Sequence, residues 1–145
     1  MSTIHISMLA IIVAVVAHFI LGFIWYTPLF GKIWAKELGL NMDQKPPKGA
    51  MAKGMIAMLI GNFLMAWVLA HNMGAWAIAS VGTPMADTPP AVNAFMAAMF
   101  TWMGFFLPVD IGTVTWEMKS WKLFWINTGY HFASLLLVSM ILVHM

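Results

Sequence analysis

The sequence contains no cysteine and no arginine, and it carries few charges of either sign. The absence of cysteine excludes disulfides, Cys-ligated zinc and thiol nucleophiles. Only 8% of the 145 residues are charged, whereas soluble domains average about a quarter. The net charge of +2 and the lack of a basic patch with interleaved aromatic residues argue against a nucleic-acid partner. No phosphate-binding glycine loop, HExxH motif or Ser-His-Asp constellation is present.

What the sequence has in excess is apolar residues, which make up 62% of the chain. A soluble fold of this size could not bury so much apolar surface, so the surplus must face lipid. A membrane span needs about 20 mostly apolar residues. We therefore predict an all-α membrane protein, one domain over residues 1–145, with four spans near 4–27, 52–73, 91–109 and 122–143. The first span should stop before Pro28, and because no Lys or Arg precedes it, we expect it to be retained rather than cleaved.

Lysine placement predicts the orientation of these spans. Five lysines lie between spans one and two or at that edge, and two lie between spans three and four: Lys32, Lys36, Lys45, Lys48, Lys53, Lys119 and Lys122. The termini and the loop at 74–90 have none. Positively charged loops stay in the cytoplasm. This predicts a multi-pass protein of the bacterial inner membrane with both termini outside the cytoplasm.

A short helix is predicted just after the first span. Apolar residues recur at helical spacing over 29–39, while Lys32 and Lys36 occupy another face. This pattern is typical of an amphipathic helix on the membrane surface, and Gly39 should end it. Aromatic residues gather near the same boundary, as in an interfacial belt: Trp25, Tyr26, Trp34, Trp116, Trp121 and Trp125.

Each span carries a polar residue at a similar predicted depth. His18, Asn62, Thr101 and His131 each lie nine residues from the expected cytoplasmic edge, about 13–14 Å deep at 1.5 Å per residue. The expected intramembrane layer comprises His18, Asn62, Thr101, Asn127, Tyr130 and His131. It could hydrogen-bond helix to helix, or it could hold a ligand, proton or metal. Asp110 and Glu117 fall near the inner edge, where they can reach Lys119 or Lys122 as solvated interfacial charges.

Small residues and methionines recur at helical spacing. The expected helix-packing positions are Ala14, Gly22, Ala57, Gly61, Ala94 and Ala98, and we expect Gly22 and Gly61 to face another helix. The 15 methionines, with imidazole, could hold Cu(I), although methionine also packs well as an adaptable apolar residue. His18 and His131 are weak metal candidates and could also ligate haem axially if spans one and four are adjacent. We predict no resident cofactor.

Two segments resemble a bacterial membrane family known as domain of unknown function 1761. The first segment runs from Gly22 to Trp34 and includes Trp25, Tyr26, Pro28, Gly31 and Lys32; the second runs over 116–131 and ends in Asn-Thr-Gly-Tyr-His. The resemblance implies a four-span helical fold and no known activity. His18 and Asp110 lie outside both motifs.

Three functions are compatible with these features. The first is a non-enzymatic bundle that associates with itself or serves as an accessory subunit of a larger membrane complex, because reactive motifs are lacking and small-residue stripes are present. The second is an oligomeric transporter or channel for a small solute, ion or proton that uses the His18–Asn62–His131 layer. The third is a membrane enzyme with a histidine-bound metal or haem.

The lysine distribution leads to a testable topology. Reporter fusions at Met145 and within 75–88 should report extracytoplasmic locations, and fusions within 40–48 should report a cytoplasmic one. Paired alkaline phosphatase and fluorescent protein fusions provide the measurement. A cytoplasmic reading at Met145 would contradict the four-span arrangement.

Overall fold

The structure is a computed structural model that describes residues 5–145, without the side chains of residues 84 and 85. Within this range the chain is helical throughout, with connections but no strand, which confirms the predicted all-α class. The elements in chain order are α1 (Met8–Ile24), η1 (Trp25–Leu29), α2 (Gly31–Glu37), α3 (Ala50–Ala79), η2 (Pro84–Asp87), α4 (Pro90–Thr101), η3 (Trp102–Phe106), α5 (Leu107–Thr115) and α6 (Trp121–His144). Four stretches are long and apolar enough to cross a membrane: Met8–Leu29, Ala50–Ala79, Pro90–Thr115 and Trp121–His144.

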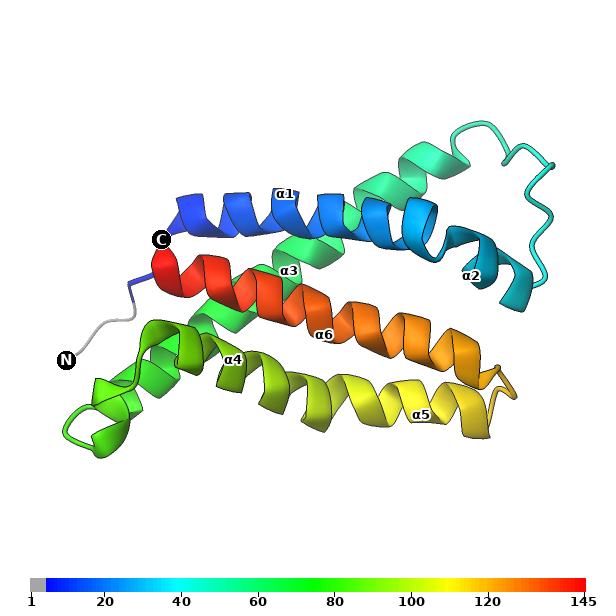
Figure 1. Ribbon diagram of the computed structural model, residues 1–145. Coiled ribbons are helices and arrows are strands. Elements are labelled where there is room, and N and C mark those ends of the chain that lie inside the picture. Colours follow the sequence, from blue (N-terminus) through cyan, green and yellow to red (C-terminus); the bar gives the residue numbers. More distant parts are fainter. Residues whose placement is uncertain (1–4) are drawn as a thin grey trace.

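The helix α6 lies at the centre of the arrangement. It runs between α1 on one side and α4 with α5 on the other, while α3 crosses behind them diagonally (Figure 1). It contacts every other long helix, whereas α3 packs mainly against α1. Its thirty residues make α3 about 45 Å long at 1.5 Å per residue, which exceeds a hydrocarbon core of about 30 Å. The diagonal course of α3 is the geometry that such an excess of length favours.

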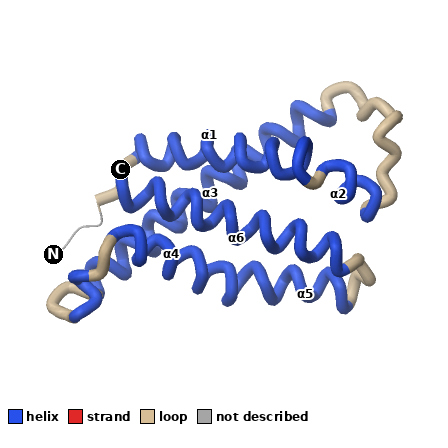
Figure 2. Tube along the Cα trace, in the orientation of Figure 1, coloured by secondary structure: helices blue, strands red, loops and turns tan. Residues whose placement is uncertain are grey.

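The two lysine-bearing connections lie at one end of the bundle. The tube view places α2, the following loop and the α5–α6 turn together, opposite the C-terminus and the α3–α4 connection (Figure 2). We call residues 30–53 and 116–125 the lysine end. Their common location is the one that the sequence predicted from lysine placement.

Three helical stretches continue beyond the predicted ends of their spans. The expected start at Ile4 lies outside the described residues, but the first span continues through Pro28 to Leu29. The third continues to Thr115 instead of 109, and α3 continues to Ala79 instead of 73. A proline inside an α-helix lacks an N–H and collides with the carbonyl four residues earlier. A π-turn accompanies the proline near the end of the first span and the proline in the middle of the third. Pro28 lies inside η1, and Pro108 follows η3. The wider turn lets both helices continue.

The short helix predicted over 29–39 is present as α2. Gly39 adopts a φ of +67°, a left-handed conformation that glycine tolerates best. Its N–H donates to Lys36 O at 3.0 Å, and the N–H of Leu40 donates to Ala35 O at 2.9 Å. These two bonds form a Schellman motif, which ends the helix at the expected glycine.

The packed core occupies the half of the bundle away from the lysine end. It consists of Ile11, Ala14, Ala66, Leu69, Ala98, Leu135 and Val138, contributed by four helices. Three of these residues are alanines, which let helix backbones approach closely where apolar burial cannot drive association in lipid. Large apolar side chains instead cover the outside, with Phe105 and Val109 about 70% exposed. Small residues in the core and large apolar side chains on the outside are expected for a helix bundle that is surrounded by lipid.

Gly22 and Gly61 provide a matched test of helix packing. A Cβ at Gly22 would collide with the end of the Met58 side chain and would lie 2.8 Å from Tyr130 Oη, whereas one at Gly61 would meet nothing within 4 Å. We expect Gly22→Ala to destabilise the protein by about 1–3 kcal/mol through overpacking. Gly61→Ala should be neutral or stabilising, because alanine favours helix by up to about 1 kcal/mol. Thermal unfolding in one detergent measures both, and equal melting temperatures would contradict the packing described.

Candidate functional site

Two consecutive aromatic residues attach the end of the first span to α6. Trp25 Nε1 donates to the backbone oxygen of Ile126 at 3.0 Å, and Tyr26 Oη donates to Asn127 Oδ1 at 3.1 Å. The Tyr26 ring also packs edge-on against Tyr130, with ring centroids 4.9 Å apart. These contacts fix α1 and α6 relative to each other at the depth where the cavity described next begins. Both residues were predicted to sit in an interfacial belt; the structure shows that they are half-buried and bonded to a helix.

The π-turn η1 and the helix α2 pack closely, because the backbone at Gly31 lies next to the backbone oxygen of Tyr26. A Cβ added to Gly31 would lie 2.6 Å from the backbone oxygen of Tyr26, so only glycine fits there. The ring of Trp34 packs edge-on against Tyr26 at 5.4 Å between centroids. The residues of the first motif therefore form one packed unit that holds α2 against the end of the span.

A cavity of about 210 Å³ opens between α1, α3, α6 and η3, beside the packed core. Its lining comes from one side chain on α1, one face of α3, one face of α6 and the end of η3: His18, Met58, Gly61, Asn62, Met65, Phe106, Tyr130, His131 and Ser134. His18, Asn62 and His131 lie well inside their respective spans. The cavity is therefore placed within the membrane-spanning part of the fold.

Four buried polar side chains on this cavity have no hydrogen-bond partner in the protein. The unpartnered atoms are His18 Nδ1, Asn62 Nδ2, Tyr130 Oη and Ser134 Oγ. None of the four residues is more than 8% exposed. The hydroxyls of Tyr130 and Ser134 are close, one helical turn apart, yet neither reaches hydrogen-bonding geometry. Buried polar groups without partners are costly, so this cluster indicates a place where a polar guest can bind.

The ionisable pair at the edge of the cavity joins Asp110 to His131. Asp110 Oδ2 lies 2.8 Å from His131 Nδ1, with the side chains 8% and 29% exposed. An ionised carboxylate can only accept, which places the proton of this bond on Nδ1 and leaves Nε2 as the free ring nitrogen. Phe106 packs against the same imidazole, with ring centroids 4.8 Å apart.

The interpretation of Asp110 as a solvated interfacial charge was wrong. The third span extends to Thr115, so Asp110 lies inside it. Helical side chains lean toward the N-terminus of their helix. The His131 side chain therefore leans toward the lysine end, where α6 begins. The Asp110 side chain leans away from that end, so the two side chains approach each other. A sequence signal was available, because no charged residue follows Asp110 before Glu117 and the span could have been extended.

The structure assembles most of the expected polar layer but not all of it. His18, Asn62, Tyr130 and His131 line the cavity. Asn127 instead accepts the Tyr26 hydrogen bond. Thr101 is half-buried and does not line the cavity; its neighbour Trp102 donates through Nε1 to Thr128. Ser134 and Phe106, which were not among the predicted site residues, also line the cavity.

Four of the six expected helix-packing residues pack against other helices, and two do not. Ala14, Gly22, Ala94 and Ala98 are buried against other helices. Ala57 and Gly61 are exposed, and Gly61 opens onto the cavity. Within this chain Gly61 therefore does not face another helix as expected.

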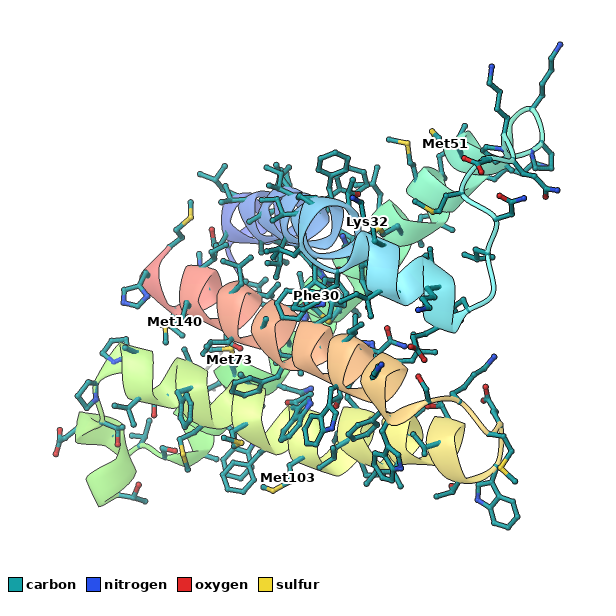
Figure 3. All side chains as sticks on the ribbon, turned by 45° about the vertical axis from the view of Figure 1, so that its right-hand side comes forward. Phe30, Lys32, Met51, Met73, Met103 and Met140 are labelled. Atoms are coloured by element: carbon teal, nitrogen blue, oxygen red, sulfur yellow. The ribbon has the colours of Figure 1, made fainter. Side chains whose placement is uncertain are left out.

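The cavity contains donors for one kind of metal. Among residues 5–145 no group of three His, Cys, Asp or Glu is placed to hold an ion. Met58 and Met65 do share the cavity with His18 and His131, which is a donor set suited to Cu(I). The other methionines are dispersed, with Met51 at the outlying start of α3 and Met103 on the outer side of the third span (Figure 3). A cavity of about 210 Å³ lies below the range of roughly 300–1,000 Å³ for drug-sized ligands.

Comparison with known proteins bears on both sequence motifs. A family model described as "Protein of unknown function (DUF1761)" matches residues 9–143. The chain belongs to the DUF1761 family. No curated protein and no solved structure matched the chain. In this DUF1761 protein the two motifs that resemble the family meet in space, because Trp25 and Tyr26 of the first donate to Ile126 and Asn127 of the second. The family membership carries no activity, so function must be argued from the cavity.

The Asp110–His131 bond leads to a prediction on stability. Asp110→Asn keeps an oxygen that can accept from His131 Nδ1, whereas Asp110→Leu leaves that donor unpaired. We expect the leucine variant to lose about 1–3 kcal/mol and the asparagine variant less. Glu117→Leu, which removes an exposed acid just beyond the same span, is the control and should change stability little. Unfolding measured in detergent would contradict the assignment if Asp110→Leu and Glu117→Leu behaved alike.

Proposed function

We propose that this DUF1761 protein binds a small, neutral, hydrogen-bonding solute within the membrane and carries it across, as a channel or transporter. The observation that supports this function is the cavity with four buried, unpartnered polar atoms on it. A structural polar layer would satisfy its own groups by hydrogen bonds between helices, as His–Asn–His contacts could have done. Here the four residues line the cavity, and their buried polar atoms have no partner in the protein.

The chemistry of the lining defines the class of solute. Asn62 Nδ2 donates, while the hydroxyls of Tyr130 and Ser134 both donate and accept. The single carboxylate on this side of the bundle, Asp110, is already paired with His131, so the cavity offers no spare counter-charge. A neutral guest avoids the cost of an unpaired charge in hydrocarbon. The volume equals that of about seven water molecules at roughly 30 Å³ each, which suits a solute of a few heavy atoms.

Self-association is a second function that one observation favours. Ala57 and Gly61 form a small-residue pair on a side of α3 that no other helix of this chain covers. Such pairs let transmembrane helices approach closely. Because Gly61 also borders the cavity, a second copy packed there would close the cavity on that side. Association between copies, or with another membrane subunit, is therefore compatible with the transport function.

The proposed setting is the bacterial cytoplasmic membrane, with the lysine end facing the cytoplasm. The support is that both lysine-bearing connections share one end of the bundle. Lysine-rich loops are retained on the cytoplasmic side during insertion. Both termini would then lie outside.

Flux through the cavity can be tested in proteoliposomes with urea and glycerol as probes. Stopped-flow light scattering should show faster entry of at least one probe than in protein-free liposomes. Asn62→Leu and Ser134→Val should slow that entry, because each removes a polar group from the cavity lining.

The matched control is Ser139→Val. Ser139 is also buried on α6 and also lacks a partner, but it does not line the cavity. This variant should retain the flux of the unaltered protein. The proposal fails if neither probe enters faster than in empty liposomes, or if Ser139→Val and Ser134→Val reduce flux equally.

A further inference from the structure

A second cavity, of about 300 Å³, lies at the lysine end and is separate from the intramembrane one. It is lined by Lys32, Ile33, Lys36 and Glu37 of α2 and by Lys122 of α6. Residues nearly ninety positions apart in sequence are thus brought to one hollow by the packing of α2 against the start of α6. Lys32 projects from α2 at this end of the molecule (Figure 3).

The charge of this hollow is not neutralised by the protein. Three ammonium groups and one carboxylate line it, and within residues 5–145 the single ion-paired contact is that between Asp110 and His131. Glu37 therefore does not form an ion pair with any of the three lysines. The three lysines outnumber the one carboxylate, so the hollow has a net positive charge that favours an anionic guest.

The helix α6 adds to the positive potential. It is 24 residues long, and Lys122 is its second residue. The first turn of a helix exposes N–H groups that no carbonyl within the helix can accept, and its end carries partial positive charge. Ser120 caps one of these groups, accepting from the N–H of Leu123 at 3.1 Å. Lys122, in this first turn, lines the cavity, and the positive end of a helix favours a phosphate.

The position of the cavity suits a phosphate that is attached to a lipid. The lysine end carries the exposed Trp121 and Trp125, which are typical of the headgroup region. Ile33 forms part of the cavity wall and is 47% exposed, and Leu29, just before α2, is 57% exposed. Apolar surface next to a cationic hollow matches a ligand with an anionic head and an apolar tail.

We propose that the cavity lined by Lys32, Ile33, Lys36, Glu37 and Lys122 binds the headgroup of an anionic phospholipid. The three ammonium groups contact the phosphate, and Glu37 accepts a hydrogen bond from a hydroxyl of the headgroup, as phosphatidylglycerol would provide. The lipid tail lies along Ile33 and Leu29. This site is independent of the solute cavity, which lies deeper in the bundle.

Two triple variants with the same change in net charge test the site. One replaces Lys32, Lys36 and Lys122 by Gln, and the control replaces Lys45, Lys48 and Lys53, which are on the same end but outside the cavity. Native mass spectrometry after titration with phosphatidylglycerol or phosphatidylcholine measures lipid retention. A lysine near an anionic lipid surface contributes about fivefold in binding, so the cavity variant should lose its preference for phosphatidylglycerol while the control keeps most of it.

Two further experiments decide whether the bound phosphate belongs to a lipid headgroup or is free inorganic phosphate. Inorganic phosphate at millimolar concentration should not displace phosphatidylglycerol, because the tail contributes to binding; displacement would overturn the assignment to a lipid. Glu37→Leu, which removes the acceptor, should lower the retention of phosphatidylglycerol relative to that of phosphatidic acid, which has no headgroup alcohol. Equal loss of preference in both triple variants would also overturn the proposal, since it would indicate diffuse attraction to the whole lysine end.

Discussion

The hydrogen bonds from Trp25 and Tyr26 to α6 are the contacts on which the rest of this bundle depends. Apolar burial gives little drive for association in lipid, where the surroundings are as apolar as the helices. Directed polar contacts and close packing must fix the arrangement instead. Two donors on consecutive residues of the first span meet acceptors on consecutive residues of the last. They set the spacing of α1 and α6 at one end of the bundle, while alanines set it at the other.

That difference between the two ends creates the cavity. Where small residues face each other the helices touch, and the core is fully buried. Where aromatic and imidazole side chains lie between the helices, the ring of Tyr130 packs near Trp25, Tyr26, His18 and His131 and holds α1 and α6 apart. The diagonal α3 contributes only Met58, Gly61, Asn62 and Met65 to that side. The missing side chain at Gly61 leaves open space that a larger residue would fill.

The sequence predicted the features that depend on composition and local rules. Hydropathy located four spans, lysine placement put two loops at one end, and Gly39 marked the end of α2. Prediction from the sequence failed where contacts between neighbouring spans decide the structure. The rule that proline ends a helix does not allow for π-turns, so the first span was ended before Pro28. The third span was ended just before Asp110, although the helical stretch continues to Thr115. With that span cut short, Asp110 was assigned to solvent, whereas its carboxylate lies 2.8 Å from His131 Nδ1. Nothing local to Gly61 distinguishes a glycine that packs from one that lines a cavity.

The central position of α6 has a consequence for how the protein is made. Spans enter the membrane in the order of synthesis, and α6 is the last of the four. Until it arrives, Asp110 lacks His131, Tyr26 and Trp25 lack their acceptors, and α4 lacks its main neighbour. A ribosome that stalls before residue 121 would leave three spans with a charged group exposed to lipid and no partner for it. The unfinished bundle therefore bears the cost of an unpaired polar side chain in hydrocarbon until α6 is inserted.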